Sequence, residues 1–266
     1  MNILYCGDIG IIDGLFLSAL SLCKYSERSL NFYILTATVG DRQAIGQTEA
    51  KRLQNAVSKI NSQNNVTLFD ITEIFNSYLP TANLATRFTP LCMLRLFADK
   101  IPELPSKLLY LDTDVMCRAN FNELYDTDIQ NFEIAGVPDR YGKWFFGNIL
   151  KHDYFNSGVL LMNMQNIKKS NTFEHCRKIC RERKMFMPDQ SALNKTAKKL
   201  KVHPKYNEQG KIKSNTVFKH FTTFFKFFPY IHTVTVKPWQ YDKLHNQLNI
   251  FEFDDIISTY EKEYKQ

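Results

Sequence analysis

Two aspartates separated by one residue, Asp112 and Asp114, come directly after the strongly hydrophobic segment KLLYL at positions 107–111. Because a buried strand leads straight into them, both carboxylates can reach one divalent cation at the strand's end. Hard oxygen ligands suit Mn²⁺ or Mg²⁺. A cation held there can act as a Lewis acid and neutralise a diphosphate leaving group. The pattern therefore predicts a metal site that assists the departure of a diphosphate.

The same tripeptide, Asp-Thr-Asp, occurs a second time at 126–128. It follows the amphipathic stretch FNELY at 121–125 rather than a buried strand. Since Asp is common in turns and at helix ends, we interpret this second copy as a turn or cap. Two aspartates at this spacing are weak evidence alone, so the preceding strand is what distinguishes the first copy.

The first seventy residues alternate between segments typical of strands and of helices. Apolar runs indicate strands at 1–5, 30–36 and 66–71, and helical spacing is found at 15–22 and at 42–61, where Asp41 is the expected N-cap. This alternation predicts an α/β fold with a mostly parallel central sheet and helices on both faces. Such sheets bind ligands at the carboxyl ends of their strands, and Asp8 directly follows the first strand.

The rest of the chain continues the α/β pattern. We expect helices at 87–98, 166–183 and 190–200 and strands at 107–111, 132–137, 158–162 and 216–221. We find no Gly/Ser-rich or Pro-rich linker and no internal repeat. The expected organisation is one domain over 1–240 followed by a short helical extension over 241–266.

The composition of the 266 residues is that of a globular protein, with a net charge of +7 and a pI near 9.0. A basic chain can bind nucleic acid, lie near anionic lipid, or bind an acidic substrate such as a nucleotide diphosphate. No nucleic-acid-binding motif accompanies the lysines. No apolar span is long enough to cross a membrane, and Asp8 and Asp13 stand where a signal peptide needs positive charge.

The six cysteines show no metal-cluster spacing. We expect Cys6, Cys23, Cys92 and Cys117 to be small buried thiols and assign no metal or redox role to the pair four residues apart, Cys176 and Cys180. A chain of this size does not need disulfides, which fits a reducing, cytoplasmic compartment.

Four motifs occur in a fixed order: LYLDTDV at 109–115, YFNSGVLLMN at 154–163, PDQSALN at 188–194 and KPW at 237–239. Together they resemble glycosyltransferase family 8, which holds retaining α-galactosyl- and α-glucosyltransferases of bacterial surface polysaccharides and glycogenin-like enzymes. The resemblance runs from Met1 to Trp239. It implies the nucleotide-sugar-binding fold called GT-A and transfer from a UDP-hexose donor.

The resemblance also implies roles for individual residues. Asp8 contacts the uracil base, Asp112 and Asp114 bind the metal with Asp112 near the ribose, Arg95 lies near the donor sugar and diphosphate, and Lys237 contacts a phosphate. Asp139 and Asn156 hold hydroxyls of the transferred sugar, and Asp189 and Gln190 lie beside its anomeric carbon. Three of the last four also have a plain alternative, since Asp139 suits a turn, Asn156 a strand cap and Asp189 a helix start.

The third metal ligand departs from the family pattern. The family usually reads H-F-T-G followed closely by K-P-W. Here His220 begins the motif, but Thr223 replaces the glycine and a segment rich in Phe and Lys precedes Lys237. His232, five residues before Lys237, is the rival. Imidazole is a reasonable Mn²⁺ ligand beside two carboxylates, and we favour His220.

The segment at 218–230, FKHFTTFFKFFPY, has two interpretations. Its phenylalanines can belong to the core, which is the default. Its mixture of Phe and Lys can also form a membrane-facing lip for a lipid-linked acceptor at the inner face of an anionic membrane. Both stay open from the sequence, and the core interpretation ranks first.

The predicted reaction is therefore metal-dependent transfer of galactose or glucose from a UDP-sugar to a saccharide acceptor of a surface glycan, with retention at the anomeric carbon. A nucleotidyltransferase is the first alternative, but the loop at 6–12, CGDIGII, lacks the basic residues that a triphosphate needs. A non-catalytic basic protein that binds nucleic acid is the second. The sugar, the acceptor, the oligomeric state and the choice between a covalent and a front-face route stay undetermined.

Overall fold

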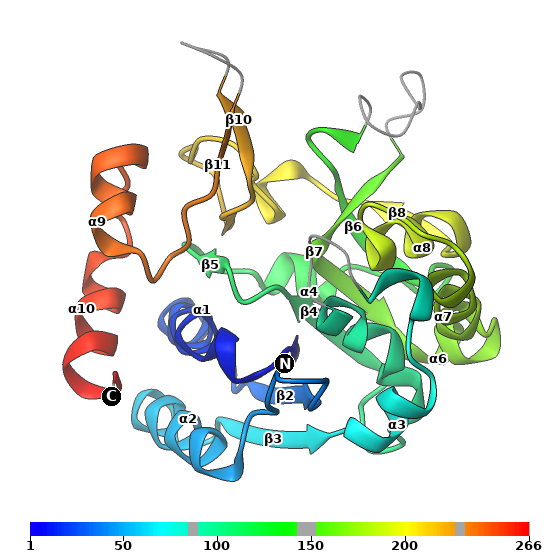
Figure 1. The fold of residues 1–266 in the computed structure, drawn as a ribbon. Helices are drawn as coiled ribbons and strands as arrows, with labels where there is room; N and C mark the ends of the chain where they lie inside the picture. The colour runs from blue at the N-terminus through cyan, green and yellow to red at the C-terminus, as the bar shows by residue number, and fades with distance from the viewer. Residues whose placement is uncertain (85–89, 143–152, 227–231, 266) are drawn as a thin grey trace.

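The structure, a computed structural model, describes residues 1–84, 90–142, 153–226 and 232–265. A seven-stranded sheet forms its centre, in the order β3-β2-β1-β4-β7-β6-β8 (Figure 1). The strands are β1 (Asn2–Cys6), β2 (Asn31–Thr36), β3 (Asn65–Asp70), β4 (Lys107–Leu111), β6 (Ile134–Pro138), β7 (Phe155–Asn163) and β8 (Lys199–Lys201). Neighbours run parallel except at β7, which is antiparallel to both β4 and β6. The expected mostly parallel sheet is thus confirmed.

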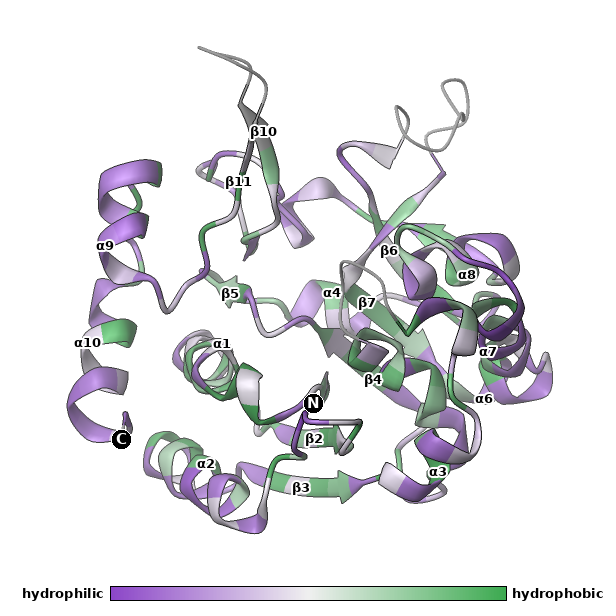
Figure 2. Ribbon diagram, viewed as in Figure 1, coloured by the Kyte–Doolittle hydropathy of each residue, from purple (hydrophilic) through white to green (hydrophobic). Residues whose placement is uncertain are grey.

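Helices cover both faces of this sheet. One face carries α1 (Ile12–Tyr25), α2 (Gln47–Ile60) and α10 (Asp254–Glu263), and the other carries the 3₁₀ helix Pro90–Lys100, α7 (Thr172–Glu182) and α8 (Pro188–Thr196). Figure 2 shows the apolar strands between these two layers. Within β1, Ile3 and Tyr5 point into one core cluster and Leu4 into the other, because successive side chains alternate across a strand.

Shorter elements complete the described chain. They are the helices α3 (Thr72–Ser77), α4 (Asn122–Asp126), α6 (Met164–Lys169) and α9 (Tyr241–Lys243), the 3₁₀ turns Ile9–Ile11, Thr81–Asn83 and Pro204–Tyr206, and the π-helical segment Leu244–Leu248. Two antiparallel ribbons lie outside the main sheet. The first pairs β5 (Val115–Cys117) with β9 (Phe218–His220), and the second pairs β10 (Phe224–Lys226) with β11 (His232–Val234).

Three expected helices differ in the structure. The expected helix at 87–98 is a 3₁₀ helix from Pro90, and its first residues lie outside the described part. The expected helix at 166–183 is divided into α6 and α7, because Asn171 takes the left-handed conformation with φ 55°. Asn tolerates that conformation better than most residues. The helix expected at 190–200 is α8, which ends at Thr196, so that 199–201 joins the sheet as β8.

The start of α2 also differs from the expectation. The helix begins at Gln47, after Gly46 as N-cap, and the Glu49 carboxylate accepts a hydrogen bond from the Gly46 N–H at 3.1 Å. Asp41 lies five residues upstream and does not cap the helix. The expectation failed because a glutamate three residues after the cap satisfies the helix start as well as an aspartate at the cap does.

The C-terminal segment packs against α1. Tyr260 of α10 lies 5.5 Å from the Phe16 ring and donates its hydroxyl to Asp13. Phe253 meets Phe221 with ring centroids 6.0 Å apart. Residues after 240 therefore contribute side chains to the same apolar core as β1 and β2.

The side chains at 218–221 face inward, and those at 222–224 are half-buried. Phe218 and Phe221 are buried in the core. Lys219, which the lip interpretation placed at a membrane surface, is also buried, and its ammonium donates to the backbone carbonyls of Glu208, Gly210 and His220. That interpretation is wrong for Lys219. Residues 227–230 lie outside the described part. Among the described helices, none has the length and apolar character needed to cross a bilayer.

Candidate active site

A cavity of about 600 Å³ opens at the carboxyl ends of β1 and β4. It also meets the first residues of β7 and α8 and the end of β9. Ten residues that the sequence singled out all contribute to its lining: Asp8, Arg95, Asp112, Asp114, Asp139, Asn156, Asp189, Gln190, His220 and Lys237. They come from segments far apart in the chain, so the topology of the sheet brings them together.

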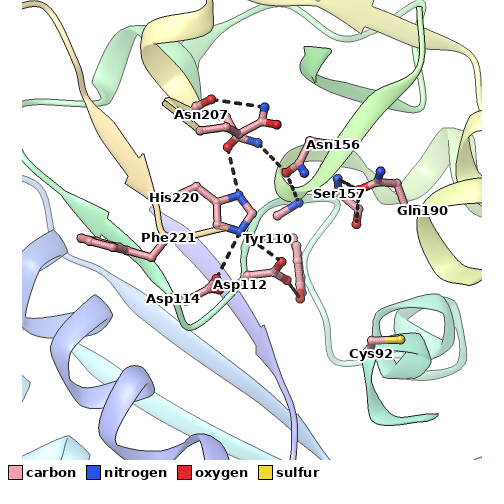
Figure 3. Close-up of polar contacts among 12 residues, drawn as sticks. Cys92, Tyr110, Asp112, Asp114, Asn156, Ser157, Gln190, Asn207, His220 and Phe221 are labelled. Carbon is pink, nitrogen blue, oxygen red and sulfur yellow. Dashed lines mark hydrogen bonds and ion pairs between the residues drawn. The ribbon is translucent and has the colours of Figure 1, made fainter. Parts of the chain in front are cut away.

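Asp112, Asp114 and His220 form a compact cluster (Figure 3). Each offers one ligand atom, and these atoms lie within 4.8 Å of one another. Asp112 follows β4, and β5 then pairs with β9 so that Val115 stands opposite His220. A Cβ on Gly158 would lie 2.1 Å from His220 Cε1, so only glycine allows β7 to pass this close.

The donor set of this cluster fits a divalent cation. The Asp114 Oδ1 atom is buried and accepts no hydrogen bond within the described residues. His220 Nε2 lies 3.2 Å from it and 3.7 Å from Asp112 Oδ2. Two carboxylates and one imidazole that converge on one point are ligands typical of Mn²⁺. An oxygen left unpaired in the interior is costly, and a bound cation would remove that cost.

Lys237 lies on the other side of the Asp114 carboxylate and pairs with Oδ2. Burial alone would raise the pKa of Asp114, but the charge of Lys237 and the neighbouring His220 outweigh it and hold that pKa below its usual value. Asp114 therefore stays ionised and available as a ligand. Lys237 keeps a cationic head at the cavity wall, where it can meet an anionic substrate.

Arg95 and Tyr110 hold Asp112 from the opposite side. The Arg95 guanidinium lies 2.8 Å from Asp112 Oδ1 and 3.4 Å from Asp189 Oδ2. The Tyr110 hydroxyl donates to the same Asp112 oxygen at 2.5 Å, and burial raises the pKa of this phenol well above its usual value. Since both partners use Oδ1, the Oδ2 atom of Asp112 stays directed towards His220.

A second polar group occupies the wall next to the metal cluster. Asp139 Oδ2 accepts hydrogen bonds from Asn156 Nδ2 at 3.0 Å and from Gln190 Nε2 at 3.2 Å. The Gln190 Oε1 atom accepts from the Ser157 N–H at 2.9 Å, and Asp189 accepts from the Ser157 hydroxyl at 3.3 Å. Asp189 and Gln190 lie in the first turn of α8, after Pro188 at its start. The four expected residues thus form one connected network.

Asp8 lies at a different part of the cavity, after β1. Its Oδ1 accepts from the Gly10 N–H at 3.0 Å and caps the 3₁₀ turn Ile9–Ile11, and its Oδ2 pairs with Arg42 at 3.0 Å. The Arg42 side chain is about half exposed and also lines the cavity.

In the segment that separates His220 from Lys237, β10 and β11 pair as an antiparallel ribbon that extends from the body of the molecule (Figure 1). The hydroxyls of Thr223 and Thr235 lie 2.7 Å apart at its base. Thr222 and Thr223 still line the cavity, and the chain returns to it at Lys237, despite the replacement of the family's glycine by Thr223. The His232 side chain lies outside the described part, so the metal cluster is defined here with His220.

Several lining residues were not anticipated. Tyr110 shares a strand face with Asp112, and the two-residue period of a strand could have found it. Gln209 comes from a segment with no periodic signal, and Arg42 begins the segment at 42–61, where the helical spacing concerns the apolar residues and not the arginine. Cys6 and Cys92, expected to be buried thiols, are only partly buried and line the cavity. Cys6 ends β1, two residues before Asp8, and Cys92 lies in the 3₁₀ helix Pro90–Lys100, which also carries Arg95.

Known proteins share this sequence and architecture. The model of glycosyl transferase family 8 matches residues 2–243. Glycosyltransferase GlyA of Streptococcus pneumoniae is 29% identical over 198 residues, which cover 72% of this chain and 25% of that protein. A lipopolysaccharide 1,2-glucosyltransferase of Escherichia coli is 25% identical over 258 residues, covering 90% of this chain and 72% of the relative. The matched segment covers only about a quarter to a half of the full length of GlyA and of two further glycosyltransferases among the relatives.

Solved structures agree on the fold. An active-site mutant of LgtC superposes with a TM-score of 0.73 at 16% identity, covering 100% of this chain and 97% of that one. The galactosyltransferase LgtC with donor and acceptor sugar analogs superposes with a TM-score of 0.68 at 18% identity, covering 97% of this chain and 96% of that one. The fold is therefore the GT-A type. The match of the family model over residues 2–243 shows that the chain belongs to glycosyl transferase family 8.

Proposed function

We propose that this chain is a metal-dependent, retaining hexosyltransferase that moves galactose or glucose from a UDP-sugar to a saccharide acceptor of a surface glycan. The cluster of Asp112, Asp114 and His220 beside Lys237 carries this proposal, because it joins a cation site to a fixed positive charge in one cavity. Leaving UDP is a diphosphate, and both features stabilise the negative charge that develops on it.

Each end of the donor has residues suited to it. Asp8 lies at the end of the cavity after β1 and can accept hydrogen bonds from the uracil base. Asp112, Asp114 and His220 are the proposed ligands of Mn²⁺, or of Mg²⁺, and the cation supplies Lewis-acid stabilisation of the diphosphate. Arg95 and Lys237 provide further positive charge near the phosphates. With the donor's base and diphosphate assigned in this way, the transferred sugar is proposed to lie next to Asp139, Asn156, Asp189 and Gln190.

The network around the sugar favours a front-face route. Asp139 accepts from Asn156 and Gln190, and Asp189 pairs with Arg95, so hydrogen bonds and an ion pair already engage both carboxylates. In this route the bond from the anomeric carbon to the phosphate oxygen breaks while the acceptor oxygen attacks on the same face. The acceptor's proton passes to the leaving phosphate oxygen. Gln190 and Asn156, held rigidly, supply preorganised dipoles for the oxocarbenium-like transition state.

The acceptor is proposed to be a saccharide, lipid-linked, with the protein in the cytoplasm and in peripheral contact with the anionic inner face of the membrane. The net charge of +7 supports this contact. Buried Lys219 takes no part in it. Salt-dependent co-sedimentation with anionic vesicles tests the contact, and absence of binding at low salt would remove it from the proposal.

Donor turnover tests the central proposal. The protein is incubated with a panel of UDP-sugars and Mn²⁺, and release of UDP is followed with and without chelator. We expect slow hydrolysis of one UDP-hexose that stops when the cation is removed. Once an acceptor is identified, the anomeric configuration of the product is determined by NMR spectroscopy. Release that is insensitive to chelator, or an inverted product, would contradict the proposal.

A further inference from the structure

Two asparagine side chains connect the sugar side of the cavity to the metal cluster through the interior (Figure 3). Asn156 is 6% exposed and Asn207 is 1% exposed. Asn207 Nδ2 lies 2.9 Å from Asn156 Oδ1, and Asn207 Oδ1 lies 3.1 Å from His220 Nδ1. Together with the bond from Asn156 to Asp139, these contacts form an unbroken chain from a carboxylate to an imidazole.

The direction of every hydrogen bond in this chain is determined. The Gly158 N–H can only donate, and it donates to Asn156 Oδ1 at 3.0 Å. Asn156 must therefore turn its NH₂ group towards Asp139, to whose Oδ2 atom it donates at 3.0 Å. Asn207 then donates to Asn156 and turns its own oxygen towards His220. Because that oxygen is an acceptor, the His220 proton belongs on Nδ1.

This tautomer decides what His220 offers to the carboxylates. With the proton on Nδ1, the Nε2 atom presents a lone pair to Asp114 Oδ1, 3.2 Å away. In the other tautomer an Nε2–H group would point into the space between the carboxylates, where a cation has to bind. The buried Asp114 Oδ1 atom accepts no hydrogen bond within the described residues, so it is available to the same cation.

We propose that Asn207 is a positioning residue that holds His220 in the tautomer with its proton on Nδ1, and so keeps the cluster open for a divalent cation. The inference rests on the proposed function in that a cation is the partner of the Nε2 lone pair. Hydrogen bonds from neighbouring groups fix the orientation of metal-binding histidines in this way. The same series of hydrogen bonds also connects His220 to Asp139, on the sugar side of the cavity.

The backbone around Asn207 is held firmly enough for this role. The Glu208 N–H donates to Phe218 O at 2.9 Å, and the His220 N–H donates to Glu208 O at 3.1 Å. One residue further, Gln209 Oε1 accepts from the Arg140 N–H at 2.9 Å and Nε2 donates to Pro138 O at 3.1 Å. The tripeptide 207–209 thus joins β9, which carries His220, to the segment that carries Asp139.

NMR spectroscopy of the metal-free protein tests the proposal directly. The protein is labelled with ¹⁵N-histidine, and the His220 signals among the six histidines are assigned by their loss in His220→Gln. At a pH where the imidazole is neutral, we expect wild type to show an unprotonated Nε2. Asn207→Leu should shift the population towards the protonated Nε2 and weaken Mn²⁺ binding, measured by calorimetry, by about 10- to 100-fold.

Two further variants separate positioning from packing. Asn207→Asp keeps an acceptor for the Nδ1–H group, so it should preserve the wild-type tautomer and most of the Mn²⁺ affinity even if it lowers stability. Asn64→Leu removes another buried asparagine, 4% exposed, which contacts Leu30, Cys23 and Val57, and it should leave the His220 signals unchanged.

The outcomes distinguish this inference from the proposed function. An unchanged His220 tautomer in Asn207→Leu, or an equal shift in Asn64→Leu, would overturn the role of Asn207 whatever the protein's activity. Wild type that binds no Mn²⁺ would overturn the proposed function, while the metal-free spectra would still decide whether Asn207 sets the tautomer.

Discussion

The tripeptide Asp-Thr-Asp occurs twice in this chain, and its two copies have different environments. At 112–114 it follows β4, lies in the cavity and meets His220 and Lys237. At 126–128 it begins at the last residue of the short helix α4, where Asp126 pairs with Arg28 on the surface and Asp128 accepts from the Gln130 N–H at 2.8 Å. The Asp114 side chain is 14% exposed and that of Asp126 59%.

The comparison shows that the tripeptide does not make a metal site by itself. The first copy becomes a candidate metal site because a buried strand ends there and because β9 brings an imidazole to the same point. The second copy has only a turn to stabilise, as the sequence context indicated. Four substitutions test this difference, beginning with the one expected to have the largest effect.

Asp114→Ala should abolish Mn²⁺-dependent UDP binding, because it removes a charged ligand from the centre of the cluster. The protein should stay folded, since Asp114 lies at a cavity rather than in the apolar core. Calorimetry with Mn²⁺ and UDP, with circular dichroism to monitor the fold, measures both. The matched variant Asp128→Ala should bind Mn²⁺ and UDP as wild type does. Equal losses from both variants would show that the environment does not distinguish the two copies.

Gly158→Ala should damage the cluster although it replaces none of the ligands. The added Cβ would lie 2.1 Å from His220 Cε1 and 2.9 Å from Asp112 Oδ2, so the imidazole must move. We expect Mn²⁺ affinity to fall by about 10- to 100-fold, as for altered surroundings of metal ligands.

Gly136→Ala, in the neighbouring strand β6, is the matched control. Its Cβ meets Leu160 and Phe155 at 3.0 and 3.2 Å, away from the ligands. Overpacking there should lower the free energy of unfolding by about 1–3 kcal/mol and leave the Mn²⁺ affinity of the folded protein unchanged. Equal Mn²⁺ affinities in the two variants would argue against close approach of β7 as the reason for glycine at 158.

His220→Ala should weaken Mn²⁺ binding by about 10- to 100-fold, since two carboxylates remain to hold the cation. His232→Ala should weaken it less. Titration calorimetry on the two variants in parallel gives the ranking. The opposite order would mean that the family's histidine corresponds to His232 and that the cluster seen here is not the metal site.

Asp126→Ala should have the smallest effect. It removes the exposed ion pair with Arg28, and pairs of this kind contribute about 0–1 kcal/mol to stability. Urea unfolding should show a change within that range, and Mn²⁺ binding should equal that of wild type. A double-mutant cycle with Arg28→Ala isolates the pair. A coupling energy well above that range would show that the second copy has a structural role that its exposure does not suggest.

Much of the fold could be predicted from the sequence because β1, β2, β3 and β4 are apolar runs with clear ends. Such runs can bury both faces only in a sheet covered on both sides. The errors concern helices at 87–98, 166–183 and 190–200, whose residues suit several helical forms. In these segments the contacts with neighbouring parts of the fold determine the helical form. At Asn171, for example, the left-handed backbone divides α6 from α7.

The resemblance to the family likewise identified ten residues of the cavity, because the motifs that carry them keep the family's order along the chain. Asn207 could not be found in this way. It follows a short 3₁₀ turn, and its segment carries no periodic pattern that indicates which way its side chain points. Only the pairing of β9 with its neighbours brings its amide to His220.

The amino-acid sequence by itself therefore determined the strands, the family and the chemical types present at the site, since these depend on local composition and on the order of motifs. The tertiary structure alone decided which of those groups meet. It joined His220 to Asp112 and Asp114, and it set the direction of the hydrogen bonds from Asp139 through Asn207. Contacts between residues about a hundred positions apart depend on how strands pair and helices pack, which no local pattern encodes.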